Sequence, residues 1–414
     1  MRQATPPDVV KIISKHIPTK VKRVLEPSIG KGALLEPFFS PRFQNLERVV
    51  GLDLDQARVA YCKNVLAKNG VAANLYVENF LTWTTKSRFD CVIMNPPFNA
   101  KNRDFVSYNN SRHSVEFAFF MKALEHLDDG GVIVAVLPAS VISGVSCGVA
   151  RSEILSILEV KKVYELDSYS FPTIEGTFFI LVGKRRRNRK SGVVLEKNFN
   201  GRKVSISLSM AQLSSCNYRL DFSYHLACAK LENLLDVSPL NFEHLESLAR
   251  IDRGQLSAPF LTAGVLHTTS FMRCGWNYPE HFSDDYEGIA ARNGDILVKR
   301  VSRNSHLSFL IYDGAGSAAL SDCVFRIRPN DGVDAFELLF AMRTLYASPL
   351  GQRLLLKGTG ANYISIEALR KVMVPIELGR RYDSQFQRYK SAICQQNYSD
   401  LVHAEKQTYE SLGL

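Results

Sequence analysis

The sequence has 414 residues, of which 46% are hydrophobic, and a formal net charge of +10 at neutral pH. This length exceeds one ordinary core, so we expect two domains with a short addition. No apolar run approaches the length of a membrane span, and the N-terminus lacks the apolar stretch of a secretory signal. Composition thus excludes a membrane protein and favours a cytoplasmic one.

The eight cysteines are scattered, with no CxxC pair and no Cys/His spacing that suits zinc. We therefore expect a reducing compartment and no bound metal. The positive charge fits a polyanionic partner such as nucleic acid, but many other proteins are equally basic. Charge alone leaves the partner open.

The first half of the chain, from Val21 to about Val182, alternates short β-branched runs with segments of helical period. This pattern predicts an α/β fold with a parallel sheet. Crossover helices are expected at residues 59–68 and 115–127, the second closed by Asp129-Gly130-Gly131. The expected strands are residues 23–25, 49–52, 91–94, 132–137, 160–166 and 178–182, with two more between 193 and 208.

The second half of the chain lacks this alternation of short apolar runs and helical segments. A basic run at residues 184–190 is either a solvated loop or a linker that contacts phosphates. Beyond Cys216 a helix at 224–235 is mixed with scattered strands, and the stretch from Arg380 onward has high helix propensity. We expect domains at residues 1–215 and 216–379, followed by a C-terminal helix at 380–414.

A glycine turn with Gly30 and Gly32 follows the first expected strand, which ends near Glu26. Glycines let the backbone approach a ligand, although many strand-to-helix turns use them only for tightness. Asp53 ends the next strand, where an acid can bind ribose hydroxyls. Together they predict an adenosine site, which a dinucleotide dehydrogenase would share.

The tetrapeptide Asn95-Pro96-Pro97-Phe98 directly follows the third expected strand. Two prolines remove backbone donors and fix φ, which leaves carbonyl oxygens pointing outward from a rigid turn. The Asn95 side chain and the Pro96 carbonyl can then accept from one amino group and aim its lone pair at the methyl carbon of a sulfonium. Phe98 offers a face for a base. The alternative is an incidental turn with a core phenylalanine.

In this order, the motifs resemble those of adenine-specific (N6) DNA methyltransferases of restriction-modification systems, in the gamma order of the TaqI methyltransferase-like enzymes. The resemblance implies a Rossmann-like, class I S-adenosylmethionine-dependent catalytic domain and a C-terminal α+β target recognition domain. It also implies S-adenosylmethionine as cofactor and duplex DNA as substrate, bound in a basic cleft between the domains. A cognate restriction endonuclease would be the functional counterpart.

The family's motifs extend the predicted site. Catalysis is assigned to Asn95, Pro96 and Phe98, and Phe171 resembles the late aromatic that packs on the flipped base opposite Phe98. Asn79 stands where the family usually has an aspartate. We therefore expect a weaker hydrogen bond to the cofactor's adenine. The cofactor-binding residues implied are Thr5, Glu26, Gly30, Gly32, Asp53, Asn79, Phe80, Asn95 and Phe119.

The C-terminal half resembles recognition domains more loosely. The suggestive segments are residues 218–225 and 358–365, the latter followed by Leu369 and Val374-Pro375. Each is also compatible with ordinary turns and strands. A basic stretch could meet DNA or form a solvated loop, and its residues are Lys299, Arg300, Arg303, Asn304 and His306.

Two other hypotheses remain open. The same chemistry serves methyltransferases that act on ribosomal or transfer RNA, or on a glutamine of release factors, but these would leave the C-terminal half unexplained. A catalytically dead DNA-specificity module is the other, and Asn79 is the feature that supports it.

Overall fold

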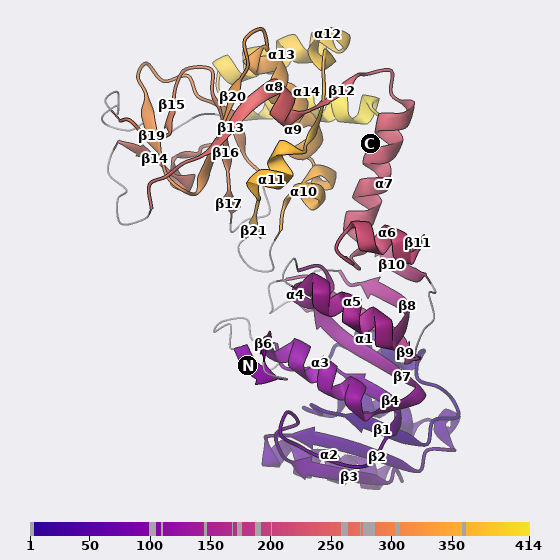
Figure 1. The fold of residues 1–414 in the computed structure, drawn as a ribbon. Helices are drawn as coiled ribbons and strands as arrows, with labels where there is room; N and C mark the ends of the chain where they lie inside the picture. Colours follow the sequence, from indigo (N-terminus) through magenta and orange to yellow (C-terminus); the bar gives the residue numbers. More distant parts are fainter. Residues whose placement is uncertain are drawn as a thin grey trace. The chain divides into compact units, whose positions relative to one another are not determined.

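The computed structural model divides between Phe222 and Ser223 into two compact units (Figure 1). None of the helices in the described part of the chain is long and apolar enough to span a membrane. The structure describes residues 4–98, 105–108, 111–144, 147–167, 169–171, 176–186, 192–199, 201–257, 264–273, 275, 286–302, 307–357 and 362–414.

The first unit contains a nine-stranded sheet in the order β11-β10-β8-β9-β7-β4-β1-β2-β3. Five neighbours, β7, β4, β1, β2 and β3, run parallel, whereas β9 is antiparallel between β7 and β8. The bounds are β1 (Arg23–Glu26), β2 (Arg48–Asp53), β3 (Ala73–Val77), β4 (Phe89–Met94), β7 (Leu127–Pro138), β8 (Leu158–Glu165), β9 (Phe178–Arg185), β10 (Val193–Phe199) and β11 (Arg202–Leu208).

Helices connect most of these strands, and those at residues 7–14, 33–39 and 56–68 pack their apolar sides against the sheet in one core. Asp55 begins α2 by accepting from the backbone N–H groups of Ala57 and Arg58. The remaining elements are α1 (Pro7–Ser14), η1 (Ala33–Phe39), η2 (Pro41–Phe43), α2 (Gln56–Lys68), the hairpin β5 (Phe105–Tyr108) and β6 (Ser111–Ser114), α3 (Val115–His126), α4 (Ala139–Ile142), α5 (Gly148–Ile157) and α6 (Met210–Ser215).

Three sequence predictions need correction in this unit. The sheet was expected to be parallel, but β9 and β11 run antiparallel to their neighbours. β3 lies at the sheet edge and was not expected, because Leu75 is its one buried residue. The glycine pair Gly130-Gly131 does not close α3 but lies within β7, where the pairing with β4 is irregular. Gly130 has a φ of +80°, so the chain makes a local turn there that favours glycine.

The second unit is α+β, with a four-stranded sheet β13-β20-β16-β18 and a three-stranded sheet β14-β19-β15. Its strands are β12 (Phe242–His244), β13 (Ala249–Arg253), β14 (Val265–Leu266), β15 (Ala290–Ala291), β16 (Ile296–Lys299), β17 (Val301–Ser302), β18 (Phe309–Ile311), β19 (Ala318–Leu320), β20 (Val324–Pro329), β21 (Asn362–Tyr363) and β22 (Met373–Pro375). Its helices are α7 (Phe222–Val237), α8 (Leu245–Leu248), η5 (Thr268–Ser270), α9 (Ala335–Tyr346), α10 (Pro349–Leu355), α11 (Ile366–Arg370), α12 (Leu378–Arg381), α13 (Asp383–Cys394) and α14 (Tyr398–Ser411).

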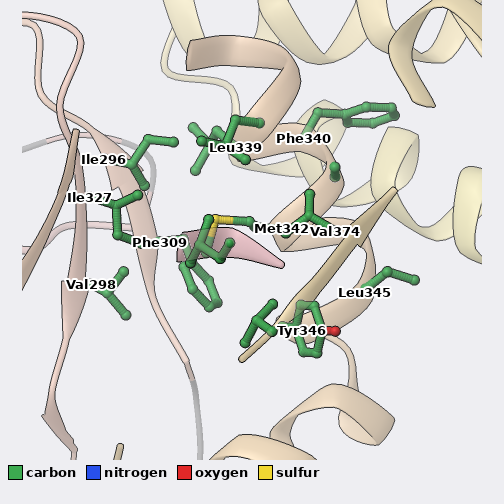
Figure 2. Packing of buried hydrophobic residues seen from close by; sticks show 14 of the residues in the cluster. Ile296, Val298, Phe309, Ile327, Leu339, Phe340, Met342, Leu345, Tyr346 and Val374 are labelled. Atoms are coloured by element: carbon green, nitrogen blue, oxygen red, sulfur yellow. The ribbon is translucent and has the colours of Figure 1, made fainter. Parts of the chain in front are cut away.

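Helix α9 is central to the core of the second unit (Figure 2). Its Leu339 and Met342 belong to the same buried cluster as Ile296 of β16 and Phe309 of β18. The Tyr346 hydroxyl donates to the Met373 carbonyl over 2.8 Å, so this buried polar group is satisfied.

The C-terminal stretch forms two helices, α13 and α14, where one was predicted. Gln396 between them has a left-handed φ of +52°, and the Asn397 side chain accepts from the Asp400 N–H to begin α14. Tyr389 and Leu401 are fully buried in the cluster that contains α9, so both helices are part of the second unit's core.

Candidate active site

A pocket in the first unit lies where three neighbouring parallel strands end. Glu26 is the last residue of β1, Asp53 the last of β2, and Asn95 follows β4. Because the carboxyl ends of parallel strands meet at one edge, these residues lie together there. The predicted site residues that line this pocket are Thr5, Glu26, Gly30, Asp53, Asn95, Pro96, Phe98 and Phe171.

Glu26 brings an unsatisfied acidic group to the pocket. Its side chain is buried, and Oε2 has no hydrogen-bond partner within the described residues. Burial, and then the nearby charge of Asp53, raise the pKa of Glu26 well above its ordinary value. A cationic ligand group would offset both effects, so the residue fits the amino group of a bound amino-acid moiety.

The glycine turn holds Asp53 in place. Gly30 and Gly32 have φ values of +54° and +80°, which side chains rarely allow. The Gly30 N–H donates to Asp53 Oδ2 over 2.9 Å, and the Asp55 N–H donates to Oδ1 over 3.0 Å. The carboxylate is therefore oriented by backbone groups on the pocket wall.

Asn95 is fixed at both its backbone and its side chain. The Ser28 hydroxyl donates to the Asn95 carbonyl over 3.0 Å, and Asn95 Nδ2 donates to Thr5 Oγ1 over 2.8 Å. Its Oδ1 is buried and has no partner in the part of the chain that the structure describes. The residue thus presents an acceptor that a ligand donor could satisfy. Neither hydroxyl contact was foreseen from the sequence.

Three phenylalanines lie together beside Asn95. The rings of Phe98 and Phe171 lie 4.9 and 4.7 Å from the ring of Phe178, between centroids. Phe98 is half-buried, whereas Phe171 is buried. Phe178 was expected only as a strand residue, since a phenylalanine at the start of an apolar run gives no functional signal. The stacking roles of Phe98 and Phe171 stay predictions.

The residues expected around the cofactor's adenine form a separate group, and none of them lines the pocket. The rings of Phe80 and Phe119 lie 5.3 Å apart, between centroids, and both are buried. Asn79 is exposed, and its Oδ1 accepts from the Leu81 N–H over 3.0 Å in a turn. This turn follows β3, next to Asp53 across the sheet. The adenine role stays a prediction.

The basic stretch expected to meet DNA is only partly described. The Lys299 ammonium lies 5.1 Å from the centroid of the Phe271 ring, and burial lowers its pKa. Arg300 Nε donates to the Asp322 carbonyl over 2.7 Å, so its guanidinium already has an internal contact. Arg303, Asn304 and His306 lie outside the described residues.

The basic run after β9 is also described only at its start. Arg185 pairs with Asp129 at 3.2 Å and Arg186 with Glu159 at 3.7 Å. Residues 187–190 lie outside the described part, so the phosphate-linker hypothesis stays a prediction.

Comparison with known proteins gives partial matches. Residues 9–142 match the methyltransferase small domain family. The chain is 27% identical over 147 residues to the Type II methyltransferase M.CvrRI of Paramecium bursaria Chlorella virus XZ-6E, which covers 34% of this chain and 36% of that protein. It is 33% identical over 87 residues to ribosomal RNA small subunit methyltransferase C of Shewanella loihica, which covers 21% of this chain and 25% of that protein.

The chain therefore spans about a third of the length of the first relative and a quarter of the second. Among solved structures, the type I restriction-modification system methyltransferase subunit from Streptococcus thermophilus aligns with a TM-score of 0.44. It is 19% identical, over 53% of this chain and 58% of that one. The family match at residues 9–142 contains β1, β2 and β4 and the residues that follow them. The first unit accordingly has the Rossmann-like fold of class I S-adenosylmethionine-dependent methyltransferases, and S-adenosylmethionine is its cofactor.

Proposed function

We propose that the protein transfers a methyl group from S-adenosylmethionine to the exocyclic amino nitrogen of an adenine flipped out of duplex DNA. The observation that carries this proposal is the buried Oδ1 of Asn95, which has no hydrogen-bond partner among the described residues. It lies in the same pocket as Glu26 and Asp53, at the start of a proline-rigid turn.

The pocket offers two oxygen atoms that can accept from one amino group. Asn95 Oδ1 and the Pro96 carbonyl each accept one N–H of the target, which holds both amino protons and leaves the nitrogen lone pair directed away from them. The base stacks on Phe98, where the contact is worth about 1–3 kcal/mol. Adenine N6 is proposed over other amino nitrogens because the motif order resembles the gamma-type adenine methyltransferases.

Other lining residues of the same pocket would hold the cofactor. Glu26 meets its amino group, Asp53 its ribose, and Thr5 the methionine end. S-adenosylmethionine supplies an electrophilic methyl group on a sulfonium. The new N–C bond forms as the S–C bond breaks, the S–C electron pair stays on sulfur, and one amino proton passes to solvent.

DNA is favoured as the substrate by the second unit, residues 223–414, which is large enough to read a sequence. The net charge of +10 favours a nucleic acid of either kind. A type II methyltransferase is among the relatives. We infer that the protein is the modification enzyme of a restriction-modification system, with a cognate endonuclease as its counterpart in the cell.

RNA methylation is the second candidate. It is favoured by the relative named as a ribosomal RNA small subunit methyltransferase, although that match covers only 21% of this chain. The amino-group acceptor would serve either nucleic acid, since the tetrapeptide recognises an amine and not a sugar.

One experiment separates these candidates. The full-length protein is incubated with methyl-labelled S-adenosylmethionine and either unmethylated bacterial genomic DNA or bacterial ribosomal RNA, and the digested nucleosides are analysed by mass spectrometry. We expect label in N6-methyladenine from DNA. Label only in RNA nucleosides would replace the DNA proposal, and label in another DNA base would refute adenine as the target.

A further inference from the structure

Asn95 has a side-chain contact that the proposed chemistry does not use. Its Nδ2 donates to Oγ1 of Thr5, a residue 90 positions earlier in the chain, over 2.8 Å. Oδ1, at the other end of the same amide, is buried and has no partner among the residues that the structure describes. One end of the amide is thus held and the other is open to a donor.

Thr5 is itself held in place by a rigid element. Pro6 caps α1, Pro7 is its first residue, and the Val10 N–H donates to the Pro6 carbonyl over 3.0 Å. Val9 and Ile13 of α1 are fully buried in the core of the first unit. Proline fixes φ, so the hydroxyl sits on a short, stiff connection to a packed helix.

An asparagine amide can turn over by 180° with little change in shape. In one orientation it offers an oxygen to the target amino group, and in the other it offers N–H groups, which would repel that donor. The productive orientation places Nδ2 in a part-buried position, where a donor without an acceptor is costly. The hydroxyl of Thr5 supplies that acceptor.

We propose that Thr5 is a positioning residue that holds the Asn95 amide with its nitrogen toward Thr5 and its oxygen toward the target amino group. This inference rests on the proposed function. It differs from the expectation that Thr5 only contacts the cofactor, because a hydroxyl can accept from Asn95 and still donate its own proton elsewhere.

Kinetic measurements distinguish a cofactor-binding role of Thr5 from a role in positioning Asn95. Loss of a cofactor contact raises the KM for S-adenosylmethionine and leaves kcat unchanged, whereas loss of acceptor orientation lowers kcat even when the cofactor is saturating. Thr5→Val keeps the shape and removes the hydroxyl. We expect it to lower single-turnover methyl transfer to DNA at saturating cofactor by about 5- to 150-fold. Thr5→Ser should restore the rate to within about threefold of wild type.

The controls are a surface threonine and two measurements that do not depend on turnover. Thr84→Val, at an exposed position, should leave the rate unchanged. Calorimetric binding of S-adenosylmethionine and the thermal unfolding temperature of each variant test for lost affinity or folding. If Thr5→Val proves unstable, Thr5→Ala removes the same hydroxyl without adding apolar bulk and should lower the rate in the same way.

An unchanged kcat for Thr5→Val, or a failure of Thr5→Ser to recover the rate, would overturn the inference while leaving the proposed function intact. Failure of the wild type to methylate DNA would instead contradict the proposed function. In that case the same variants are compared on whichever nucleic acid the wild type methylates.

Discussion

Two buried acceptor atoms in the pocket of the first unit differ from one buried charged pair in the core of the second. Glu26 Oε2 and Asn95 Oδ1 are buried with no partner within the described residues. Arg343, which is also buried, donates to the Glu405 carboxylate and to the Phe309 carbonyl. Unsatisfied acceptors on a pocket wall indicate a ligand, whereas a matched pair within a core indicates a structural role.

The largest effect predicted by this comparison is on stability. Arg343→Met leaves the Glu405 carboxylate without its main partner in the core, and we expect it to lower the free energy of unfolding by about 3–5 kcal/mol. Urea unfolding of the full chain measures this change. The exposed pair Arg388–Asp400 is the control, and Arg388→Met should cost at most about 1 kcal/mol.

If Arg343→Met instead costs no more than Arg388→Met, the second unit does not depend on its buried pair and the comparison fails. A double variant tests whether the loss comes from the unpaired charge. Arg343→Met combined with Glu405→Leu removes both charges and should recover most of the loss, because an apolar pair of similar size leaves no buried charge.

The next largest expected effect is the loss of base stacking on Phe98. Phe98→Ala should lower kcat/KM for DNA by about 5- to 150-fold, the equivalent of about 1–3 kcal/mol of base stacking. Steady-state methyl transfer measures it, and cofactor affinity should not change. Phe199→Ala, on β10 and four strands away from β4, is the control. Equal losses in both variants would indicate general damage to the fold and not a base contact.

The smallest effect concerns pH. Because the pKa of Glu26 is raised in the folded protein, its neutral form is favoured there, and stability is lost as pH rises from the ordinary value of 4.5 through the raised pKa. Glu26→Gln lacks this titration, so wild type should lose thermal stability relative to the variant as the pH rises above 4.5. Thermal unfolding measures both proteins.

Glu36, an exposed residue nearby in the chain, provides the matched control as Glu36→Gln, whose stability should follow that of wild type across the same pH range. If Glu26→Gln also follows wild type, then Glu26 is not an uncompensated buried acid, and the contrast between the two regions is weaker than described.

Much of the first unit could be predicted from its sequence. Apolar β-branched runs identify a strand because both faces of a central strand are buried, as in β4. They do not give direction, so the antiparallel β9 could not be distinguished from its parallel neighbours. The edge strand β3 buries only Leu75 and lacks such a run. The break between α13 and α14 has no glycine or proline, and Asn397 was its one signal.

The site residues at the ends of strands could be predicted from the sequence. The contacts between segments that are distant in the sequence could not. Glu26, Asp53 and Asn95 share an edge because neighbouring parallel strands end at the same edge of the sheet. The hydrogen bond from Asn95 to Thr5 depends on how α1 packs on the core, which no local pattern encodes. The contact of Phe178 with Phe171 could not be predicted either, because its sequence context is that of any core phenylalanine.

In the proposed reaction, Asn95 Oδ1 accepts an N–H from the amino group of a base in DNA. Its most direct test is single-turnover transfer of labelled methyl groups from S-adenosylmethionine to unmethylated duplex DNA by wild type, Asn95→Ala and the exposed control Asn69→Ala. We predict a loss on the order of 100-fold or more for Asn95→Ala at saturating cofactor, with Asn69→Ala unaffected. Undiminished transfer by Asn95→Ala would contradict the account.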